Sequence, residues 1–482
     1  MHLQGASTIA EGDGSYADRN GGSYQHSAHP WRRRHTDTRP SAQVAVMLDA
    51  PSPPAFVQTI QEDVCRGGEP CAVPARTNDA EVTDGQVQRT EETSLPEGGP
   101  SALTSDQLSA RSTSREDVTS LYDRNGLKVR WYFQGGLNLV SETNLFWNFA
   151  SVYAPDADFN SDETWLEGYV KPGIGFEKAF AGGNVLYGKL SGVGSRTWGT
   201  DAFDARNQGA VTLEEGYLGF RTTGAPINFD LSLGPRELRL GTGMLIANGG
   251  VSGFERGALK FGPRKAWKKA AIARIMSGRP TFTGYFIAPN ELPSNNGRNE
   301  LAGFDIRHNA ASGDYLGFTY SNVLRSDSPY VRAASGGLGA PTIITGGRDQ
   351  TNAVNLYFRA SRDEGTLRNW LVSGDLAYEW NNRIDMAAWA LRAQVGYDFA
   401  QAAWTPSLTY TFKLFSGDDP TTPKLERFDP LYYEGSPGAW ATGSKSSMVF
   451  INSNLRAHEV SLAVQPSKKD ALTLRYARIS TH

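Results

Sequence analysis

The stretch that decides the fold is Trp389-Ala390-Leu391-Arg392-Ala393-Gln394-Val395-Gly396-Tyr397-Asp398-Phe399. Its apolar side chains recur at every second position, and Arg392, Gln394 and Asp398 lie between them. Such alternation places one set of side chains on each face of a β-strand. A segment of about 10 residues also has the length that a tilted strand needs to cross a bilayer. We therefore predict a membrane-spanning strand here.

The same period of two occurs over 127–134, 354–359 and 404–414. Compact turns such as Gly313-Asp314 separate some predicted strands, whereas long polar segments such as 416–447 separate others. Alternating short and long connections are typical of a transmembrane barrel. We predict an all-β fold, a transmembrane antiparallel β-barrel of about 16–18 strands over residues 125–482. The further predicted strands are 143–150, 170–178, 184–191, 213–222, 227–234, 236–242, 256–262, 270–276, 280–287, 300–309, 314–322, 369–380, 457–464 and 471–478.

Residues 1–120 differ in composition from the rest of the chain. They contain few large apolar residues and are rich in Ser, Thr, Gly, Pro and charged residues. Such a segment buries too little apolar surface to offset its chain entropy, so we predict that it is mostly disordered. The only cysteines of the chain, Cys65 and Cys71, lie here and predict a small disulfide loop or free thiols rather than a metal site. The basic run at 31–35 is interpreted as a solvated tail.

A soluble β-sandwich or propeller is the alternative fold, because its strands would also alternate. Two features oppose it. Aromatic residues such as Trp380, Trp389 and Trp404 gather near predicted strand ends, as in the girdle of a membrane barrel. Full charges also stand in the middle of the polar face, where a solvated lumen tolerates them. The net charge of -3 argues against nucleic acid as a partner.

The polar face of the predicted strands carries many basic residues with carboxylates among them. Basic rings favour anions, and interspersed carboxylates hold the arginine side chains. The alternation therefore predicts an anion-favouring lumen, while the alternative is that these residues only form ion pairs that stiffen the wall. The predicted lumen cations are Arg130, Arg221, Arg239, Arg307, Arg359, Arg392, Lys413 and Arg475, and the predicted carboxylate partners are Glu237, Asp305, Asp375, Glu379 and Asp398.

Signatures of enzymes are missing from the sequence. It has no Gly-x-Ser-x-Gly elbow, no His-Glu-x-x-His, no P-loop and no dinucleotide-binding glycine motif before a helix. The acidic stretch at 416–420 is interpreted as the start of a loop rather than a cation site. We therefore expect no catalytic residues, no metal and no cofactor.

Several motifs resemble the alginate-export family of outer-membrane porins. Gly234-Pro235-Arg236-Glu237-Leu238-Arg239-Leu240-Gly241 is similar to a Gly-Arg-Gln-Glu-Leu type run of that family. The segments 384–390, 396–399 and 416–418 follow in the family's order, and Phe428-Asp429-Pro430-Leu431 is similar to its Phe-Asp-Pro-Leu element. The resemblance covers roughly residues 125–480.

The resemblance implies a barrel of about 18 strands in the outer membrane of a Gram-negative bacterium. It implies passive movement of an anionic polysaccharide such as alginate, or of small anionic solutes, through an arginine-rich pore. Outer-membrane lipid and the barrel assembly machinery are the other implied partners. Arg236, Glu237 and Arg239 are carried over from the matched motif, although Arg236 is out of phase with the other two.

The sequence departs from the family pattern in three places. No export signal is visible, Pro235 replaces a strand residue, and the chain ends at His482 without a terminal aromatic strand. These departures predict a missing signal and a missing closing strand. Two other functions stay open at this point, namely a general small-solute uptake porin on the same fold and a soluble carbohydrate-binding β protein.

Overall fold

The structure is a computed structural model, and it describes residues 43–49, 117–148, 160–334, 336, 340–361, 368–435, 439–442, 451–467 and 470–481. For residues 43–49, 117 and 147–148 it describes the backbone alone. Most of residues 1–120, including both cysteines, therefore lie outside the described part of the chain.

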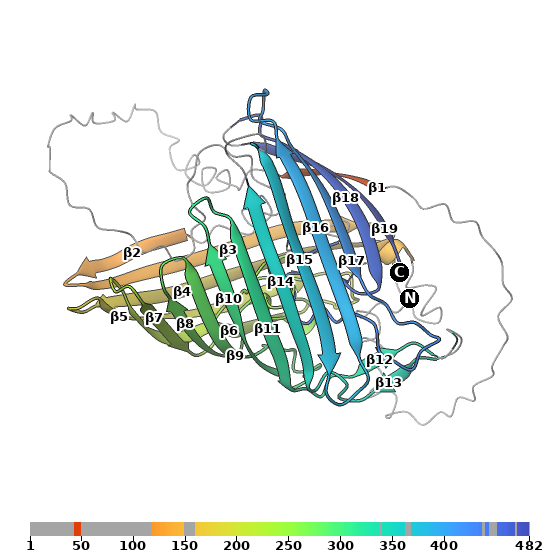
Figure 1. Cartoon of the computed structure of the whole chain (residues 1–482), viewed down its shortest axis with the longest axis horizontal. Coiled ribbons are helices and arrows are strands. Elements are labelled where there is room, and N and C mark those ends of the chain that lie inside the picture. The colour runs from red at the N-terminus through yellow and green to blue at the C-terminus, as the bar shows by residue number, and fades with distance from the viewer. Residues whose placement is uncertain are drawn as a thin grey trace, which may run out of the picture.

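Seventeen strands form one large antiparallel sheet, which curves strongly around an interior (Figure 1). Neighbours in the chain pair from β2 to β11 and from β14 to β19, β11 pairs with β14, and β1 pairs with β19. Strands β12 and β13 form a separate hairpin. The predicted all-β barrel is thereby confirmed. The strands are β1 (Gln43–Asp49), β2 (Asp117–Arg124), β3 (Leu127–Glu142), β4 (Glu163–Ala179), β5 (Asn184–Trp198), β6 (Gly209–Thr222), β7 (Asn228–Leu233), β8 (Lys269–Met276), β9 (Pro280–Ala288), β10 (Glu300–Asn309), β11 (Tyr315–Arg325), β12 (Tyr330–Arg332), β13 (Thr342–Ile344), β14 (Thr351–Ser361), β15 (Trp370–Asn381), β16 (Ala387–Asp398), β17 (Ser407–Phe415), β18 (Leu455–Val464) and β19 (Ala471–Ser480).

The apolar and polar residues that alternate in the sequence lie on opposite faces of this wall. In β16, Ala388, Ala390 and Arg392 are buried, while Trp389 and Val395 are exposed on the opposite face. Large apolar side chains are exposed on the outer face all around the sheet, with Leu139 at 72% and Val211 at 88%. A soluble sandwich would bury this face, so the exposed apolar face fits lipid and excludes the soluble alternative.

The two ends of the barrel differ in their connections. Residues 125–126, 180–183, 223–227 and 277–279 are short turns at one end, which we call the turn end. The connections 143–162, 234–268, 326–350 and 416–454 lie at the other end, the long-loop end. In bacterial barrels the longer loops face outward from the cell. No helix in the described part of the chain is long and apolar enough to span a membrane.

Three predicted strands are wrong. Residues 236–242 and 256–262 are not strands, because both belong to the long connection between β7 and β8, which holds the short 3-10 helix η3 (Phe254–Arg256). The segment 143–150 is not a strand either, since β3 ends at Glu142 and the 3-10 helix η2 (Leu145–Asn148) follows. The barrel also begins earlier than Leu127, because β2 starts at Asp117.

Candidate functional site

Two long connections fold back into the barrel. We call residues 234–268 the first inner segment, and residues 416–435 with 439–442 the second inner segment. They meet in a parallel bridge, in which Tyr432 N donates to Leu245 O at 2.9 Å and Ala247 N donates to Tyr432 O at 2.9 Å. Because the segments are almost 190 residues apart in the chain, sequence periodicity cannot show that they touch.

The wall leaves room for the inner segments by presenting small residues. Ala353, Ala377, Ala388, Ala390 and Ala457 face inward and are at most 1% exposed. They form one apolar cluster with residues of both inner segments, including Leu238, Met244, Leu425, Phe428 and Trp440. Gly136 on β3 also lacks a side chain where the Phe261 ring approaches, and a Cβ there would lie 2.7 Å from that ring. The inner segments therefore narrow the bore of the barrel.

Carboxylates of the wall hold the inner segments by their backbone, and we call these contacts the carboxylate clamps. Glu167 accepts hydrogen bonds from Lys260 N at 3.2 Å and Phe261 N at 3.0 Å. Glu214 accepts from Lys265 N at 2.7 Å and Ala266 N at 3.0 Å. In the second inner segment, Asp429 N donates to Glu379 at 2.8 Å. All three carboxylates are buried, so these hydrogen bonds fix the segments to the wall.

A β-bulge explains why Glu214 can reach inward. The register of β5 against β6 shifts between Ser191 and Gly192, so that Glu214 and Glu215 both face the interior. The bulge gives each carboxylate its own lysine: Lys171 lies 3.5 Å from Glu214, and Lys189 lies 2.9 Å from Glu215. The signal in the sequence is two consecutive glutamates in an alternating strand, and our alternation analysis missed it.

Two buried arginines were also missed. Arg264 donates to Thr212 Oγ1 at 2.8 Å, to Ser195 Oγ at 2.9 Å and to two backbone carbonyls of the wall. Arg256 donates to carbonyl oxygens of Val251, Asn290 and Glu291. Both side chains tie the first inner segment to neighbouring structure. No carboxylate forms an ion pair with either one in the described part of the chain, so their role here is positioning.

One cluster of polar contacts joins the wall to both inner segments. Arg392 of β16 pairs with Asp375 of β15 at 2.7 Å, and both side chains are almost fully buried. Trp440 covers the Arg392 guanidinium at 4.3 Å and donates from Nε1 to Thr242 O at 2.7 Å. Thr242 Oγ1 in turn donates to Asp375. This junction includes two residues that were predicted to face the lumen, yet the ring of Trp440 covers the Arg392 guanidinium.

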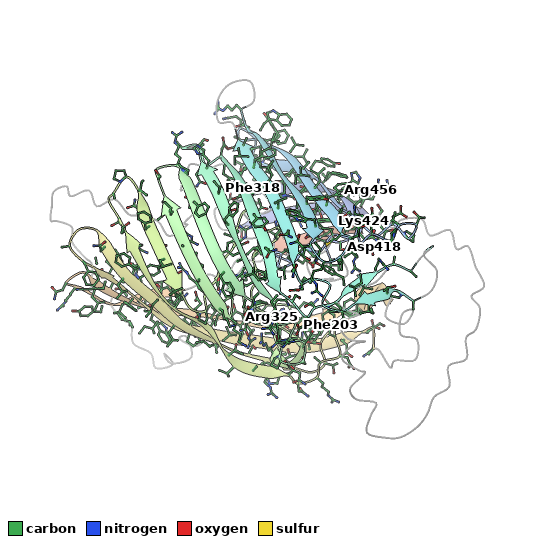
Figure 2. The ribbon with its side chains drawn as sticks, turned by 60° about the horizontal axis from the view of Figure 1, so that its bottom comes forward. Phe203, Phe318, Arg325, Asp418, Lys424 and Arg456 are labelled. Carbon is green, nitrogen blue, oxygen red and sulfur yellow. The ribbon has the colours of Figure 1, made fainter. Side chains whose placement is uncertain are left out.

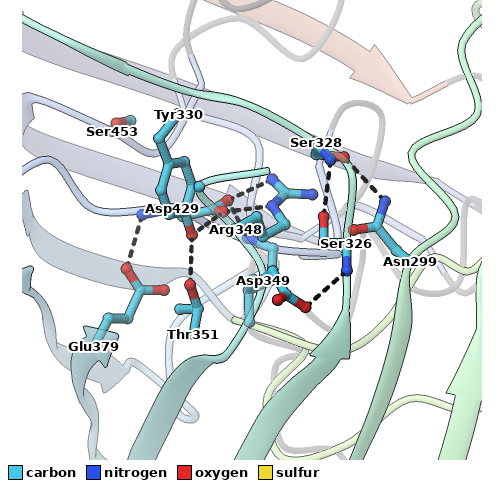
Figure 3. A network of polar contacts seen from close by, with 12 residues as sticks. Asn299, Ser326, Ser328, Tyr330, Arg348, Asp349, Thr351, Glu379, Asp429 and Ser453 are labelled. Atoms are coloured by element: carbon cyan, nitrogen blue, oxygen red, sulfur yellow. Dashed lines mark hydrogen bonds and ion pairs between the residues drawn. The ribbon is translucent and has the colours of Figure 1, made fainter. Parts of the chain in front are cut away.

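A second network lies near the long-loop end (Figure 3). Asp429 accepts from Arg348 Nε at 2.7 Å and from Tyr330 Oη at 2.9 Å, while Glu379 accepts from the Asp429 backbone. Burial alone would lower the pKa of Arg348, but the Asp429 carboxylate together with Tyr432 and Tyr330 outweighs burial and raises that pKa. Arg348 therefore stays charged and locks the second inner segment to the loop that precedes β14.

The other predicted cations divide into paired and unpaired residues. Arg130 and Arg221 share Glu177, at 3.9 and 3.2 Å. Lys413 lies 3.3 Å from Glu459, and Arg239 lies 3.0 Å from Glu434 in the second inner segment. Arg236 is buried and donates to the hydroxyl oxygens of Tyr187 and Ser232.

Arg307, Arg359 and Arg475 are different, because they form no ion pair with any carboxylate that the structure describes. All three are half-buried on the inner face. Arg307 donates to Asn309 at 2.8 Å and lies 4.1 Å from the Tyr315 ring, and Tyr315 faces Arg359 across the β11–β14 ladder. All three lie in the turn-end half of the barrel.

Among the predicted carboxylates, only Asp375 forms an ion pair with a predicted lumen arginine in the described part of the chain. Glu237 pairs with Lys171 at 2.7 Å. Asp305 accepts from the hydroxyl groups of Thr319 at 2.6 Å and Tyr357 at 2.9 Å. Glu379 accepts the hydrogen bond from Asp429 N that forms one of the carboxylate clamps. Asp398 stands opposite Ser407 at the turn end of β16. No group of three potential metal ligands occurs among the described residues.

A curved antiparallel wall with an apolar outer face and a charged, loop-narrowed interior defines a channel of the bacterial outer membrane. Residues 347–480 match the alginate export family. This match confirms the family resemblance of the motifs at 384–455, and the motif at 234–241 lies outside the matched residues. A search of the curated proteins found no match.

Solved porins are also similar to this chain. Pseudomonas putida OprB is 7% identical with a TM-score of 0.39, and the alignment covers 73% of this chain and 93% of OprB. Vibrio cholerae OmpT is 10% identical with a TM-score of 0.34, covering 75% of this chain and 99% of OmpT. A Rhodopseudomonas blastica porin variant is 8% identical with a TM-score of 0.33, covering 73% and 100%.

Proposed function

We propose that this outer-membrane channel passes an anionic polysaccharide of the alginate type through an anion-favouring lumen. The observation that carries the proposal is that three lumen arginines, Arg307, Arg359 and Arg475, form no ion pair with any carboxylate that the structure describes. A guanidinium without a carboxylate partner is available to a passing anion, whereas a paired one has most of its charge neutralised. The family to which residues 347–480 belong supports the polymer as the solute.

The geometry of the bore agrees with a linear solute. The inner segments fill part of the interior, and the carboxylate clamps fix them to the wall. A narrow bore admits an extended chain in single file and rejects a bulky solute. Insertion of such a wall into the outer membrane would require the barrel assembly machinery as a partner.

Ion selectivity in a planar bilayer tests the proposal. We expect the wild-type channel to prefer Cl⁻ over K⁺ in a KCl gradient. Replacement of Arg307 and Arg359 by Gln should lower the anion-to-cation permeability ratio roughly fivefold per charge, since one charge at close range is worth about 1 kcal/mol in water. The matched control is Arg298→Gln with Arg383→Gln, which removes two charges that are paired in the outer loops. A cation preference of the wild-type channel would contradict the proposal.

A general uptake porin for small anions is the second candidate, and the rigid anchoring of the inner segments favours it. If these segments never move, the bore admits only small solutes. Liposome flux separates the two functions, because an exporter should release trapped oligouronates as well as acetate. Release of acetate without oligouronates would favour the uptake porin.

A further inference from the structure

Three basic residues lie together on the outer face of the last two strands. Arg456 and His458 are on β18, and Arg478 is on β19. The ladder pairs His458 directly with Arg478. Arg456 lies two residues before His458 on the same face, opposite Ser480 and diagonal to Arg478. Side chains in these positions are about 5–8 Å apart. We call this group the outer basic cluster.

The outer basic cluster faces lipid and not the lumen. Its neighbours along the same face are Val460 and Leu462 on β18 and Leu474 and Tyr476 on β19, all of which are exposed apolar residues. The intervening residues, such as Ala457 and Glu459, are buried on the inner face. Figure 2 labels Arg456 on the wall near the long-loop end.

Among the described residues, no carboxylate forms an ion pair with either arginine. Arg456 and Arg478 are exposed and form no ion pair with any residue that the structure describes. His458 shares a hydrogen bond of 2.8 Å with the Tyr410 hydroxyl group. Like charges on neighbouring strands repel each other, and an arginine on the lipid face costs about 2–4 kcal/mol at the bilayer midplane but about 0–1 kcal/mol at the interface. The cluster therefore requires headgroup depth and a counter-anion.

The position along the barrel agrees with headgroup depth. β18 begins at Leu455, so Arg456 is at its long-loop end. The aromatic residues Tyr378, Trp380 and Trp389 stand at the same end of β15 and β16, on the other side of β17. Rings of this kind mark the boundary between hydrocarbon and headgroups. Long loops face outward, which places the cluster in the outer leaflet.

We propose that the outer basic cluster binds the phosphate groups of an outer-leaflet lipid. Two guanidinium groups on adjacent strands can each donate two parallel hydrogen bonds to phosphate oxygens, and one phosphate between them relieves their repulsion. The site is independent of the lumen, so it goes beyond the transport of a solute. It makes a phosphorylated lipid a bound component of the wall at β18 and β19.

Native mass spectrometry of the full chain in detergent tests the proposal with lipid A as the probe. We expect lipid A to remain bound to the wild-type protein, and Arg456→Gln with Arg478→Gln to weaken binding about 25-fold, roughly fivefold per arginine. Arg456→Lys with Arg478→Lys should retain most of the affinity, because the charge stays. The control pair Arg298→Gln with Arg383→Gln removes the same charge elsewhere and should bind lipid A normally.

Three outcomes would overturn the proposal: equal lipid A affinity of the double Gln variant and the wild type, equal binding of a phosphate-free glycolipid, or binding of inorganic phosphate without lipid A. Channel conductance measured on the same variants should not change. This readout separates the lipid site from the proposed transport function. If the wild-type channel showed no anion selectivity, the transport proposal would fail, but the lipid A result would still stand.

Discussion

At the scale of single residues, the interior contains ion pairs whose neighbours decide their role. Alternation placed Asp375 and Arg392 on the inner face, and the structure shows that they pair across adjacent strands. The burial of this pair under Trp440 could not be predicted, since Trp440 belongs to a connection that alternation does not describe. Likewise, the pairing of Glu237 with Lys171 depends on a segment that leaves the wall.

Removal of Asp375 should destabilise the barrel strongly. Asp375→Ala leaves the buried Arg392 unpaired, which costs about 3–5 kcal/mol, whereas Asp375→Ala combined with Arg392→Met should recover most of that loss. Urea unfolding in lipid vesicles, followed by Trp fluorescence, measures both free energies of unfolding. If the double variant is as unstable as the single variant, the unpaired charge is not the cause.

The loop residue Asp201 should make stability depend on pH. Burial raises its pKa from 3.8 to about 6. The folded state therefore holds the proton more tightly, so the stabilisation is complete below pH 4 and is lost as pH rises through 6. Asp201→Asn should be more stable than the wild type at pH 7, on the order of 2–3 kcal/mol, and equal to it at pH 3.5. A stability difference that does not change with pH would contradict this assignment.

At the scale of elements, the strands that face lipid on one side were predicted well. The range 300–309 agrees with β10, and 280–287 falls one residue short of β9. The predicted strand at 236–242 was wrong. Leu238 and Leu240 alternate with polar residues, but they pack into the apolar cluster inside the barrel. An apolar side chain that contacts lipid and one that contacts an inner cluster leave the same pattern, so local sequence cannot separate them.

Trp440 should limit the motion of both inner segments. Trp440→Ala removes the ring over Arg392 and the hydrogen bond to Thr242 O, and loss of a buried tryptophan costs about 3–5 kcal/mol. We expect larger and noisier single-channel conductance. Trp404→Ala, at an exposed ring near the turn end, is the matched control. A folded Trp440→Ala channel with wild-type conductance would show that the junction does not restrict the bore.

At the scale of the whole molecule, the barrel wall separates lipid on its outer face from the interior of the channel. Leu137 and Asn138 are neighbours on β3, yet Leu137 is 67% exposed on the outer face and Asn138 faces inward. Leu137→Arg places a charge on the lipid face, where the cost reaches about 2–4 kcal/mol at the midplane. The inward control, Asn138→Arg, should fold normally. Folding yield into liposomes, read by heat-modifiable gel mobility, compares the two, and equal yields would contradict the assignment of faces.

The carboxylate clamps have a consequence for how this channel can diversify. Glu167 and Glu214 bind backbone N–H groups of the first inner segment, and not its side chains. Any residue other than proline supplies such a donor. The half-buried side chain at 265 can therefore change while the segment keeps its place, whereas Ala266 is buried and Lys260 pairs with Glu142. The hydrogen bonds that hold the segment do not depend on the side chains that line the bore. A substitution in the lining can therefore change which solute the channel prefers without a change in the strands of the wall.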